Sequence, residues 1–335
     1  MQKNKFTVIG LGHIGKRHAE MIRKNENCEL VAAIDVDENL KNFVESEYKI
    51  PFFKTVDDFF SSSIKADVVN VCTPNGFHSA HAIKALENNC HVVVEKPMGL
   101  TKMECEQVIY KSLQAHKQVF CVMQNRYSPP SAWLKQIINE NRLGKIFMVQ
   151  INCYWNRDER YYKKGGWKGT KDLDGGPLFT QFSHFIDIMY WVFGDIKNVN
   201  ARFNNFNHAY TPFEDSGSVS FDFISGGMGV LNYSTSMWDK NLESSMTVIG
   251  EFGSIKIGGQ YMDQVEYCHV KDYVMPTLPP CNPPNDYGPY KGSAANHHFV
   301  IENVVETLTG KSTATTNALE GLKVVEIIER IYSLK

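Results

Sequence analysis

The sequence lacks the usual marks of a secreted or membrane-spanning protein. Its eight cysteines form no C-x-x-C pair and no framework spacing, in a 335-residue chain that is large enough to fold without disulfides. The first residues, MQKNKFTVIG, run into an expected strand without the apolar region and cleavage site of a signal peptide. No apolar run approaches the roughly 20 residues that cross a bilayer. We therefore expect reduced thiols, no membrane partner and a cytoplasmic location.

An excess of one charge is also lacking. The chain has 35 Lys and Arg against 37 Asp and Glu, a formal net charge of -2, and its basic residues are scattered. This balance excludes the basic patch that nucleic acid or an anionic membrane surface would require. A hydrophobic content of 43% with 21% charged residues is typical of a folded globular protein. The length favours two domains.

Two different strand patterns divide the chain. Up to residue 123, short apolar strands such as ELVAAIDVD and ADVVNVCTP alternate with helical patterns, which predicts a parallel sheet covered on both faces. From residue 124 onward, partly alternating strands joined by Gly-rich turns predict a large, mainly antiparallel open sheet in a second α/β domain, 124–335. We expect that domain to bind substrate and to mediate oligomerisation. Its closing helix, NALEGLKVVEIIERIYSLK, is one that can pack back on the first domain.

A glycine-rich turn, GLGHIG at residues 10–15, lies between an expected strand and an expected helix. In a G-x-G-x-x-G turn the first glycine allows the tight turn, the second admits a pyrophosphate and the third lets the helix pack on the strand. Asp35 ends the next strand, where a carboxylate accepts bonds from an adenosine ribose and repels a 2'-phosphate. The pattern therefore favours NAD over NADP, and the alternative is a glycine turn with a capping aspartate. The predicted contacts are Gly10, Gly12, His13, Ile14, Gly15 and Asp35.

The stretch VVVEKPMG, residues 92–99, ends an apolar strand with Glu95, Lys96 and Pro97. Ligands bind at the carboxyl edge of a parallel sheet, so a lysine fixed there by a proline can bond a substrate hydroxyl. The alternative is an exposed charged turn.

Together with CTPNGFH at 72–78, these motifs resemble the glucose-fructose oxidoreductase, inositol dehydrogenase and MocA family, which acts on sugars and polyols with nicotinamide cofactors. The resemblance covers nearly the whole chain. It implies a Rossmann domain followed by a larger-sheet domain, a cis Lys96-Pro97 peptide, and Lys96 as a catalytic residue. It also implies that Glu95 and Asn75 lie near the nicotinamide ribose. The cofactor set predicted in this way comprises Thr73, Pro74, Asn75, His78, Glu95, Lys96 and Gln124.

The other half of the family's site is expected on GGPLFTQFSHFIDIMYW, residues 175–191, which is apolar nearly all round and predicts one buried helix. On that helix Thr180 and His184 share a face, and Asp187 lies one turn further. A neutral His184 could accept a hydroxyl proton, and the alternative is a hydrogen-bonded core histidine. Thr180 stands where many members carry Asp, so it supplies no charge. The predicted catalytic residues are Lys96, His184, Thr180 and Asp187, with Lys96 and His184 both open as the proton acceptor.

Several longer stretches, among them NCYWNRDERYY, LFTQFSHFID and YKGSAANHH, resemble the branch that oxidises UDP-N-acetylglucosaminuronic acid at its 3-hydroxyl for bacterial surface polysaccharides. That resemblance implies a 3-keto sugar nucleotide product, a partner sugar aminotransferase, a homotetramer and tightly held NAD(H).

Such a substrate carries a carboxylate and a diphosphate. Arg157 and Arg160 could bind either group, although Asp158 and Glu159 beside them make a salt-bridged turn the alternative. Tryptophans such as Trp238 could stack on uracil or belong to core and oligomer contacts. The predicted substrate residues are Arg126, Arg157, Arg160, Lys168, Tyr290, Lys291, Ser293 and Asn296.

No metal site is predicted, because the adjacent His297 and His298 point apart and no cysteine cluster accompanies them. Two other functions stay open. A dehydrogenase of a free sugar or inositol would share the cofactor and the lysine, and a sensor would bind NAD and a sugar nucleotide without turnover.

Overall fold

The computed structural model describes residues 3–288 and 290–335. The chain forms two compact units, one of residues 1–123 with 297–325 and one of residues 124–296 with 326–335.

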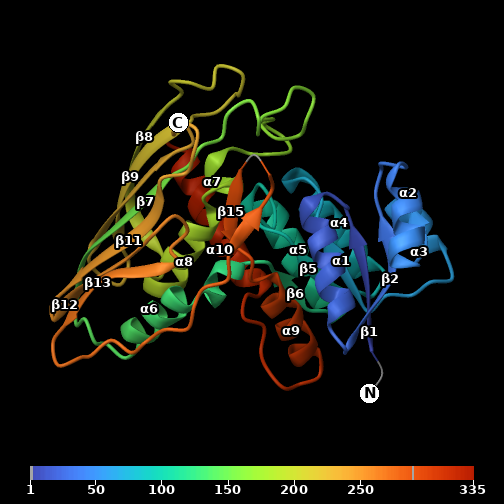
Figure 1. Cartoon of the computed structure of the whole chain (residues 1–335), viewed down its shortest axis with the longest axis horizontal. Coiled ribbons are helices and arrows are strands. Elements are labelled where there is room, and N and C mark those ends of the chain that lie inside the picture. Colours follow the sequence, from blue (N-terminus) through green and yellow to red (C-terminus); the bar gives the residue numbers. More distant parts are fainter. Residues whose placement is uncertain (1–2, 289) are drawn as a thin grey trace. The chain divides into compact units, whose positions relative to one another are not determined.

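The first unit is built on a six-stranded sheet in the order β3-β2-β1-β4-β5-β6, and every neighbouring pair is parallel (Figure 1). The strands β4 and β5 are almost wholly buried, which explains why their sequences carry so few polar residues. This is the predicted Rossmann sheet. The strands are β1 Asn4–Ile9, β2 Cys28–Ile34, β3 Phe52–Phe53, β4 Val68–Val71, β5 His91–Val94 and β6 Val119–Cys121.

Capping side chains fix the start of two helices in this unit. Thr101 and Glu104 form a reciprocal capping box at α5, and the Thr55 hydroxyl accepts the Asp58 N-H at α3. The helical segments are α1 His13–Lys24, α2 Leu40–Phe43, the π-helical η1 Val44–Tyr48, α3 Val56–Ser61, the 3-10 turn η2 Asn75–Phe77, α4 His78–Glu87, α5 Lys102–Ala115 and α9 His297–Leu308.

The end of the chain differs from the predicted division, which assigned all of 124–335 to the second domain. Residues 297–325 belong to the first unit, where α9 packs on α1. The apolar face of α9, with Val300, Ile301 and Val304, is buried, and this burial stabilises the return of the chain. The helix α10, Ala318–Tyr332, begins in the first unit and ends in the second.

The second unit contains a seven-stranded sheet in the order β13-β12-β11-β7-β10-β9-β8 (Figure 1). Only the pair β7 and β10 is parallel, so the predicted mainly antiparallel sheet is confirmed. The strands are β7 Ile146–Tyr154, β8 Ile196–Asn204, β9 Ser216–Phe223, β10 Met228–Ser234, β11 Glu243–Gly250, β12 Gly253–Gly258 and β13 Gln264–Val270, with a separate pair β14 Pro284–Asp286 and β15 Lys291–Ala294.

The helix predicted over 175–191 is interrupted. It forms α7, Pro177–Thr180, and α8, Ser183–Phe193, because the N-H of Phe182 bonds back to the Pro177 carbonyl across a widened turn. Thr180 and His184 therefore do not share one continuous helix face. The α8 helix is buried and packs against α6, Pro129–Asn139, which follows the 3-10 turn η3, Gln124–Tyr127.

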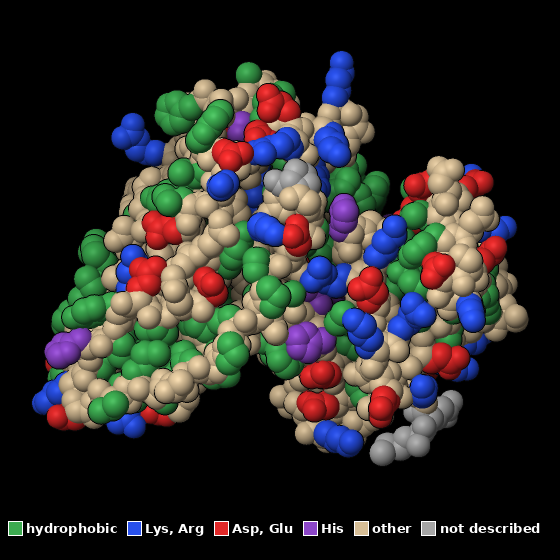
Figure 2. Space-filling view, viewed as in Figure 1, with side chains coloured by type: hydrophobic (Ala, Val, Ile, Leu, Met, Phe, Trp, Pro, Cys, Tyr) green, Lys and Arg blue, Asp and Glu red, His purple; other side chains and the backbone are tan. Residues whose placement is uncertain are grey.

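The described residues include no helix that is long and apolar enough to cross a membrane. On the face drawn in Figure 2, Lys and Arg side chains are interspersed with Asp and Glu. This agrees with the scattered charge of the sequence.

Candidate active site

The glycine turn connects β1 to α1 in the first unit, and its geometry explains all three glycines. Gly10 has a φ of 86°, and a Cβ there would lie 2.7 Å from the Cys72 carbonyl oxygen. At Gly15 a Cβ would lie 1.7 Å from the Gly10 oxygen, whereas at Gly12 it would meet nothing within 4 Å. The outer two glycines are thus needed for packing, and the middle one leaves open space above the turn.

Asp35 lies beside this turn. Its Oδ2 accepts the Leu11 N-H at 2.5 Å, and its Oδ1 accepts the Asp37 N-H at 2.9 Å. The α1 helix begins at His13, directly after the glycine turn, and a helix N-terminus favours an anion. Open space above Gly12, a helix N-terminus and a nearby carboxylate suit a diphosphate and a ribose, and NAD therefore fits these residues.

Two loops at the carboxyl edge of the same sheet are joined through His78. Its Nδ1 lies 2.7 Å from the Pro97 carbonyl oxygen, and its Nε2 lies 2.8 Å from the Thr73 carbonyl oxygen. Asn75 is buried at the start of η2, and Pro74 precedes it. The ring of His78 thus holds the loop after β4 against the loop that carries Lys96.

The stretch after β5 turns its two charges in different directions. Glu95 is buried, whereas Lys96 is partly exposed and is followed by the buried Pro97. The Lys96-Pro97 peptide is cis, as the family resemblance implied. The Lys96 N-H donates to Glu95 Oε2 at 3.2 Å, so the buried carboxylate fixes the backbone that presents the lysine.

Glu95 is held by two histidines from distant parts of the first unit. His18 Nε2 lies 3.0 Å from Glu95 Oε1, and His297 Nε2 lies 3.6 Å from the same oxygen. The Asn70 amide nitrogen lies 2.8 Å from His18 Nδ1, which places the His18 proton on Nε2, toward the carboxylate. Burial by itself would raise the pKa of the Glu95 carboxyl, but His18 and His297 outweigh it and hold that pKa well below its usual value. No sequence motif pointed to His18.

This carboxyl predicts a pH dependence of stability. The pKa of Glu95 is lower in the folded than in the unfolded chain, where it is about 4.3. The ionised carboxylate therefore contributes to the free energy of unfolding above about pH 4.3, and this contribution is lost as the pH falls toward the folded-state pKa. We expect Glu95→Gln to lower the free energy of unfolding by about 1.5 to 3 kcal/mol at neutral pH, the range for a hydrogen bond to a charged group. The difference from wild type should shrink toward pH 3 to 4, as measured by urea unfolding.

The matched control is Glu20→Gln, which removes an exposed carboxylate from α1. It should leave stability nearly unchanged at both pH values. An equal loss for Glu95→Gln at neutral and acid pH would contradict the assigned role of the Glu95 charge.

In the second unit, Arg126 and Asp187 form a buried bidentate ion pair. Arg126 Nε lies 2.9 Å from Asp187 Oδ2, and Nη2 lies 2.6 Å from Oδ1. Neither side chain is exposed, and the guanidinium also lies 5.2 Å from the centre of the Trp191 ring. Losing one partner would leave a buried charge, which typically costs about 3 to 5 kcal/mol. The pair therefore has a structural role, and the substrate role of Arg126 and the catalytic role of Asp187 stay predictions.

His184 is buried at the start of α8, and its Nε2 lies 3.2 Å from the amide nitrogen of Gln124. A neutral imidazole can accept that N-H. The Gln124 Oε1 has no hydrogen-bond partner in the described part of the chain. The neighbouring Gln181, which the sequence did not single out, is also buried, and neither of its amide atoms has a partner among the described residues. Unpaired buried amides are costly, so these groups suit a polar ligand or water.

Thr180 is bonded to a carboxylate that the sequence analysis missed. Its hydroxyl donates to Asp174 Oδ1 in a short hydrogen bond and lies 3.0 Å from the Asp174 carbonyl oxygen. Asp174 is fully buried, and its Oδ2 accepts the Gly169 N-H at 2.7 Å. Burial raises the pKa of this carboxyl above its usual value.

Arg157 is a buried cation, with only 3% of the residue exposed. It extends from the residues after β7 into a cage of aromatic rings, which stabilise a cation through their π faces. The guanidinium carbon lies 4.7, 5.2 and 5.2 Å from the ring centres of Trp155, Tyr161 and Tyr290. Desolvation lowers the pKa of this guanidinium.

The polar partners of Arg157 are neutral. Its Nη1 donates to the Asn156 carbonyl at 2.5 Å and to Asn241 Oδ1 at 3.2 Å, and its Nη2 donates to the Lys291 carbonyl at 3.0 Å. Its Nε has no hydrogen-bond partner among residues 3–288 and 290–335, and no carboxylate of these residues pairs with it. A buried cation with neutral partners suits an anion supplied by a ligand.

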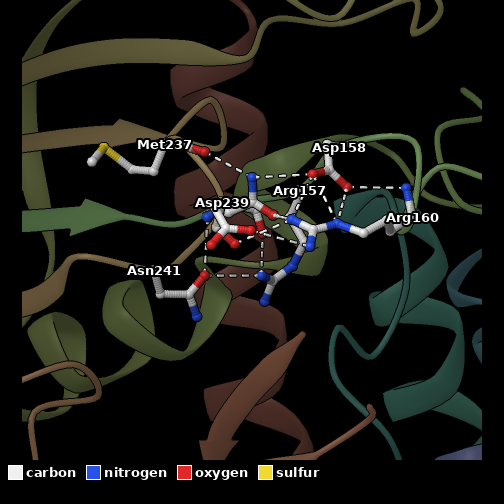
Figure 3. Close-up of polar contacts among 7 residues, drawn as sticks. Arg157, Asp158, Arg160, Met237, Asp239 and Asn241 are labelled. Carbon is white, nitrogen blue, oxygen red and sulfur yellow. Dashed lines mark hydrogen bonds and ion pairs between the residues drawn. The ribbon is translucent and has the colours of Figure 1, made fainter. Parts of the chain in front are cut away.

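Arg160 differs from Arg157 in every respect (Figure 3). It is half-exposed and pairs with Asp158 at 2.7 Å and with Asp239 at 3.3 Å. The Asn156 amide donates to the Met237 carbonyl at 2.7 Å, which ties the loop of residues 235–242 to the same turn. For Arg160 the structure contains the salt-bridged turn that was the alternative to substrate binding.

Lys168 and Tyr290 extend the aromatic cage. Lys168 Nζ donates to the Tyr290 hydroxyl at 2.5 Å and lies 4.1 Å from the centre of the Tyr161 ring. The structure thus brings together Arg157, Lys168 and Tyr290, which are far apart in the sequence. We call Trp155, Tyr161, Tyr290, Arg157 and Lys168 the cationic cage.

The other predicted substrate residues have partners within the second unit. Lys291 pairs with Asp286, and the buried Ser293 carbonyl accepts the Asn285 amide at 2.8 Å. The Asn296 amide donates to the Gln124 carbonyl and to Ser128 Oγ, both at 3.2 Å. The contact of these three residues with substrate stays a prediction.

Two protein-family models match this chain. The model described as "Oxidoreductase family, NAD-binding Rossmann fold" matches residues 4–123, and the "GFO/IDH/MocA C-terminal domain" model matches residues 132–256.

Individual proteins agree with these models. The WlbA dehydrogenase of Chromobacterium violaceum, solved with NADH and UDP-GlcNAcA, is 28% identical, covers 100% of this chain and 94% of its own, and has a TM-score of 0.89. Its Bordetella pertussis counterpart, solved with the same ligands, is 27% identical, covers 99% and 96%, and has a TM-score of 0.88. The D-glucoside 3-dehydrogenase of Escherichia coli K12 is 27% identical over 67% of this chain and 68% of its own length.

Proposed function

Because the chain belongs to the GFO/IDH/MocA family of NAD-binding oxidoreductases, we propose that it oxidises the 3-hydroxyl of UDP-N-acetylglucosaminuronic acid to a 3-keto sugar nucleotide. The observation that carries this proposal is the buried Arg157, whose partners among the described residues are neutral. A substrate with a carboxylate and a diphosphate supplies the anion that this site suits. Full-length similarity to two dehydrogenases solved with UDP-GlcNAcA supports the same substrate.

NAD would be held by the glycine turn at residues 10–15, by Asp35, and by the loop of residues 73–78. When bound, NAD supplies the acceptor for the hydride that leaves the sugar carbon. Asp35 would bond the adenosine ribose and disfavour a 2'-phosphate.

Two residues would act on the reacting hydroxyl. Lys96 would donate a hydrogen bond to the reacting oxygen and stabilise its developing negative charge. His184 would accept the hydroxyl proton at Nε2, where the substrate hydroxyl would replace the Gln124 N-H as the donor. The cationic cage would bind the carboxylate or the diphosphate of the substrate.

The chemistry of the product defines what must follow. A 3-keto sugar is the substrate class of an aminotransferase, so we propose that such an enzyme consumes this product. We also propose a homotetramer, as the sequence resemblance implies.

A second function is favoured by the E. coli relative, a D-glucoside 3-dehydrogenase. An enzyme of that class would act on a free sugar or glycoside with the same cofactor and the same lysine. Its substrate would carry no anionic group. The cationic cage, which suits an anion, argues against such an uncharged substrate.

A substrate panel tests the proposal directly. Purified protein is supplied with NAD, and NADH absorbance is followed after adding UDP-N-acetylglucosaminuronic acid, UDP-N-acetylglucosamine, a D-glucoside or myo-inositol. We expect NADH with the uronic acid and little with the others. NADH with the glucoside or the inositol alone would favour the second function and reject the first.

The cage predicts a binding defect in the same assay. Arg157→Leu should raise KM for the uronic acid about 10- to 100-fold, because it removes a charge-assisted contact worth about 1.5 to 3 kcal/mol. Inhibition by UDP separates the two anions: weakened inhibition assigns Arg157 to the diphosphate, and unchanged inhibition assigns it to the carboxylate.

Arg160→Leu is the matched control, since that arginine is half-exposed and pairs with Asp158 and Asp239. It should change KM little. An unchanged KM in a folded Arg157→Leu variant would remove Arg157 from the substrate site.

A further inference from the structure

The bond between Asp174 and Thr180 fixes the direction in which a hydroxyl group points. Asp174 is 0% exposed, and its Oδ1 receives the Thr180 hydroxyl proton in a short hydrogen bond. Thr180 itself is only partly buried. Of this bonded pair, only Thr180 has surface that a ligand could reach.

A threonine hydroxyl has one proton and two lone pairs. When an ionised carboxylate takes the proton, the oxygen can offer other groups only its lone pairs. A free threonine can act as donor or acceptor, but one bonded to a buried carboxylate acts as an acceptor.

The backbone holds the carboxylate in place. Gly169 donates its N-H to Asp174 Oδ2 at 2.7 Å, and the Asp174 N-H itself donates to the Thr170 carbonyl at 3.1 Å. These contacts leave Asp174 few other orientations, and they stabilise its charged form.

We propose that Asp174 is a positioning residue that makes Thr180 an obligate hydrogen-bond acceptor for a hydroxyl group of the sugar substrate. This inference rests on the proposed dehydrogenase function and deepens it. Thr180 selects a substrate that offers an O-H at that point, and Asp174 acts through Thr180 without touching the substrate.

Protonation of Asp174 reverses this polarity. A protonated carboxyl donates its own O-H to Thr180 Oγ, and the threonine proton then turns away from Asp174. Among the described residues, the titratable and charged groups that interact with Asp174 include Tyr161, Tyr162 and Lys168. Burial raises the pKa of Asp174 by more than the bonds from Thr180 and the backbone and the charge of Lys168 lower it, so the reversal should occur above the pH at which an exposed aspartate titrates.

The test compares four variants with wild type, using whichever substrate of the panel reduces NAD. Asp174→Asn and Thr180→Val should each lower kcat/KM about 10- to 100-fold, the range for one lost charge-assisted hydrogen bond. Thr180→Ser keeps the hydroxyl and should stay near wild type. Asp172→Asn, an exposed carboxylate two residues before Asp174, is the control and should be unaffected.

Two further readouts separate this role from a structural one. Wild-type substrate affinity, measured by calorimetry, should weaken as pH falls, and in Asp174→Asn this dependence should disappear. The double variant Asp174→Asn with Thr180→Val should be no worse than either single variant, because both changes remove the same bond.

The outcomes keep the two proposals apart. Undiminished kcat/KM in a folded Asp174→Asn variant, or an unchanged pH dependence of its substrate affinity, would overturn the role of Asp174 while the dehydrogenase function stands. Failure of wild type to reduce NAD with every substrate would overturn the proposed function and the inference together.

Discussion

Replacing Lys96 with methionine is expected to lower kcat about 10²- to 10³-fold, the loss seen when one donor to a developing oxyanion is removed. Lys96 is partly exposed at the carboxyl edge of a parallel sheet, and its backbone N-H is bonded to the buried Glu95 carboxylate. Methionine keeps much of the length of the side chain but cannot donate a hydrogen bond. Steady-state NADH formation measures the effect.

The affinity for NAD, measured by fluorescence titration, separates the catalytic role of Lys96 from its predicted contact with the cofactor. The control is Lys65→Met, which removes an exposed lysine before β4, at the opposite edge of the same sheet. Full turnover by Lys96→Met would exclude the lysine from the chemistry.

The second large effect is expected for His184→Asn. Asparagine is polar and of similar size, but it cannot take up a proton near neutral pH. We expect kcat to fall about 10²- to 10⁴-fold, the usual contribution of a general base. The limb of the pH profile that reports this base should be lost in the same variant.

His269→Asn is a suitable control, since His269 is exposed on β13. A His184→Asn enzyme with a normal rate and pH profile would reduce His184 to a structural residue that bonds Gln124. Together with the lysine variant, this result decides which of the two groups accepts the proton.

Local patterns predicted the first unit well. The glycine turn, Asp35 and the sequence around Lys96 each combine a strand end with a specific residue type, and parallel strands bring such ends to one edge. The structure adds the physical reason for Gly10 and Gly15, since a Cβ atom at either position would collide with backbone. The family inferred from these motifs is confirmed by the two family models.

Such local patterns did not predict contacts between residues that lie far apart in the sequence. Nothing in the sequence joins His18 or His297 to Glu95, and nothing distinguishes Asp174 from other loop aspartates before Thr180 is seen to bond it. A carboxylate followed by two glycines just before a buried helix was the only available signal for Asp174.

Two arginines three residues apart show that local sequence also fails to predict the environment of neighbouring side chains. Arg157 and Arg160 lie in one turn of the chain and carry the same charge, yet one is buried among aromatic rings and the other is exposed and pairs with two aspartates. Composition could not separate them, because the difference comes from Tyr290 and Asn241, which lie far along the chain.

The path of the chain between the two units also sets an order of events during synthesis. Residues 297–325 complete the first unit, but they emerge from the ribosome only after all of 124–296 has been made. At roughly 5 to 20 residues per second, the nascent first unit waits on the order of ten to several tens of seconds without α9. Throughout that interval Glu95 lacks His297, and the surface of α1 that α9 covers is open to other chains. A shortened gene that stops at residue 123 would make this transient state permanent.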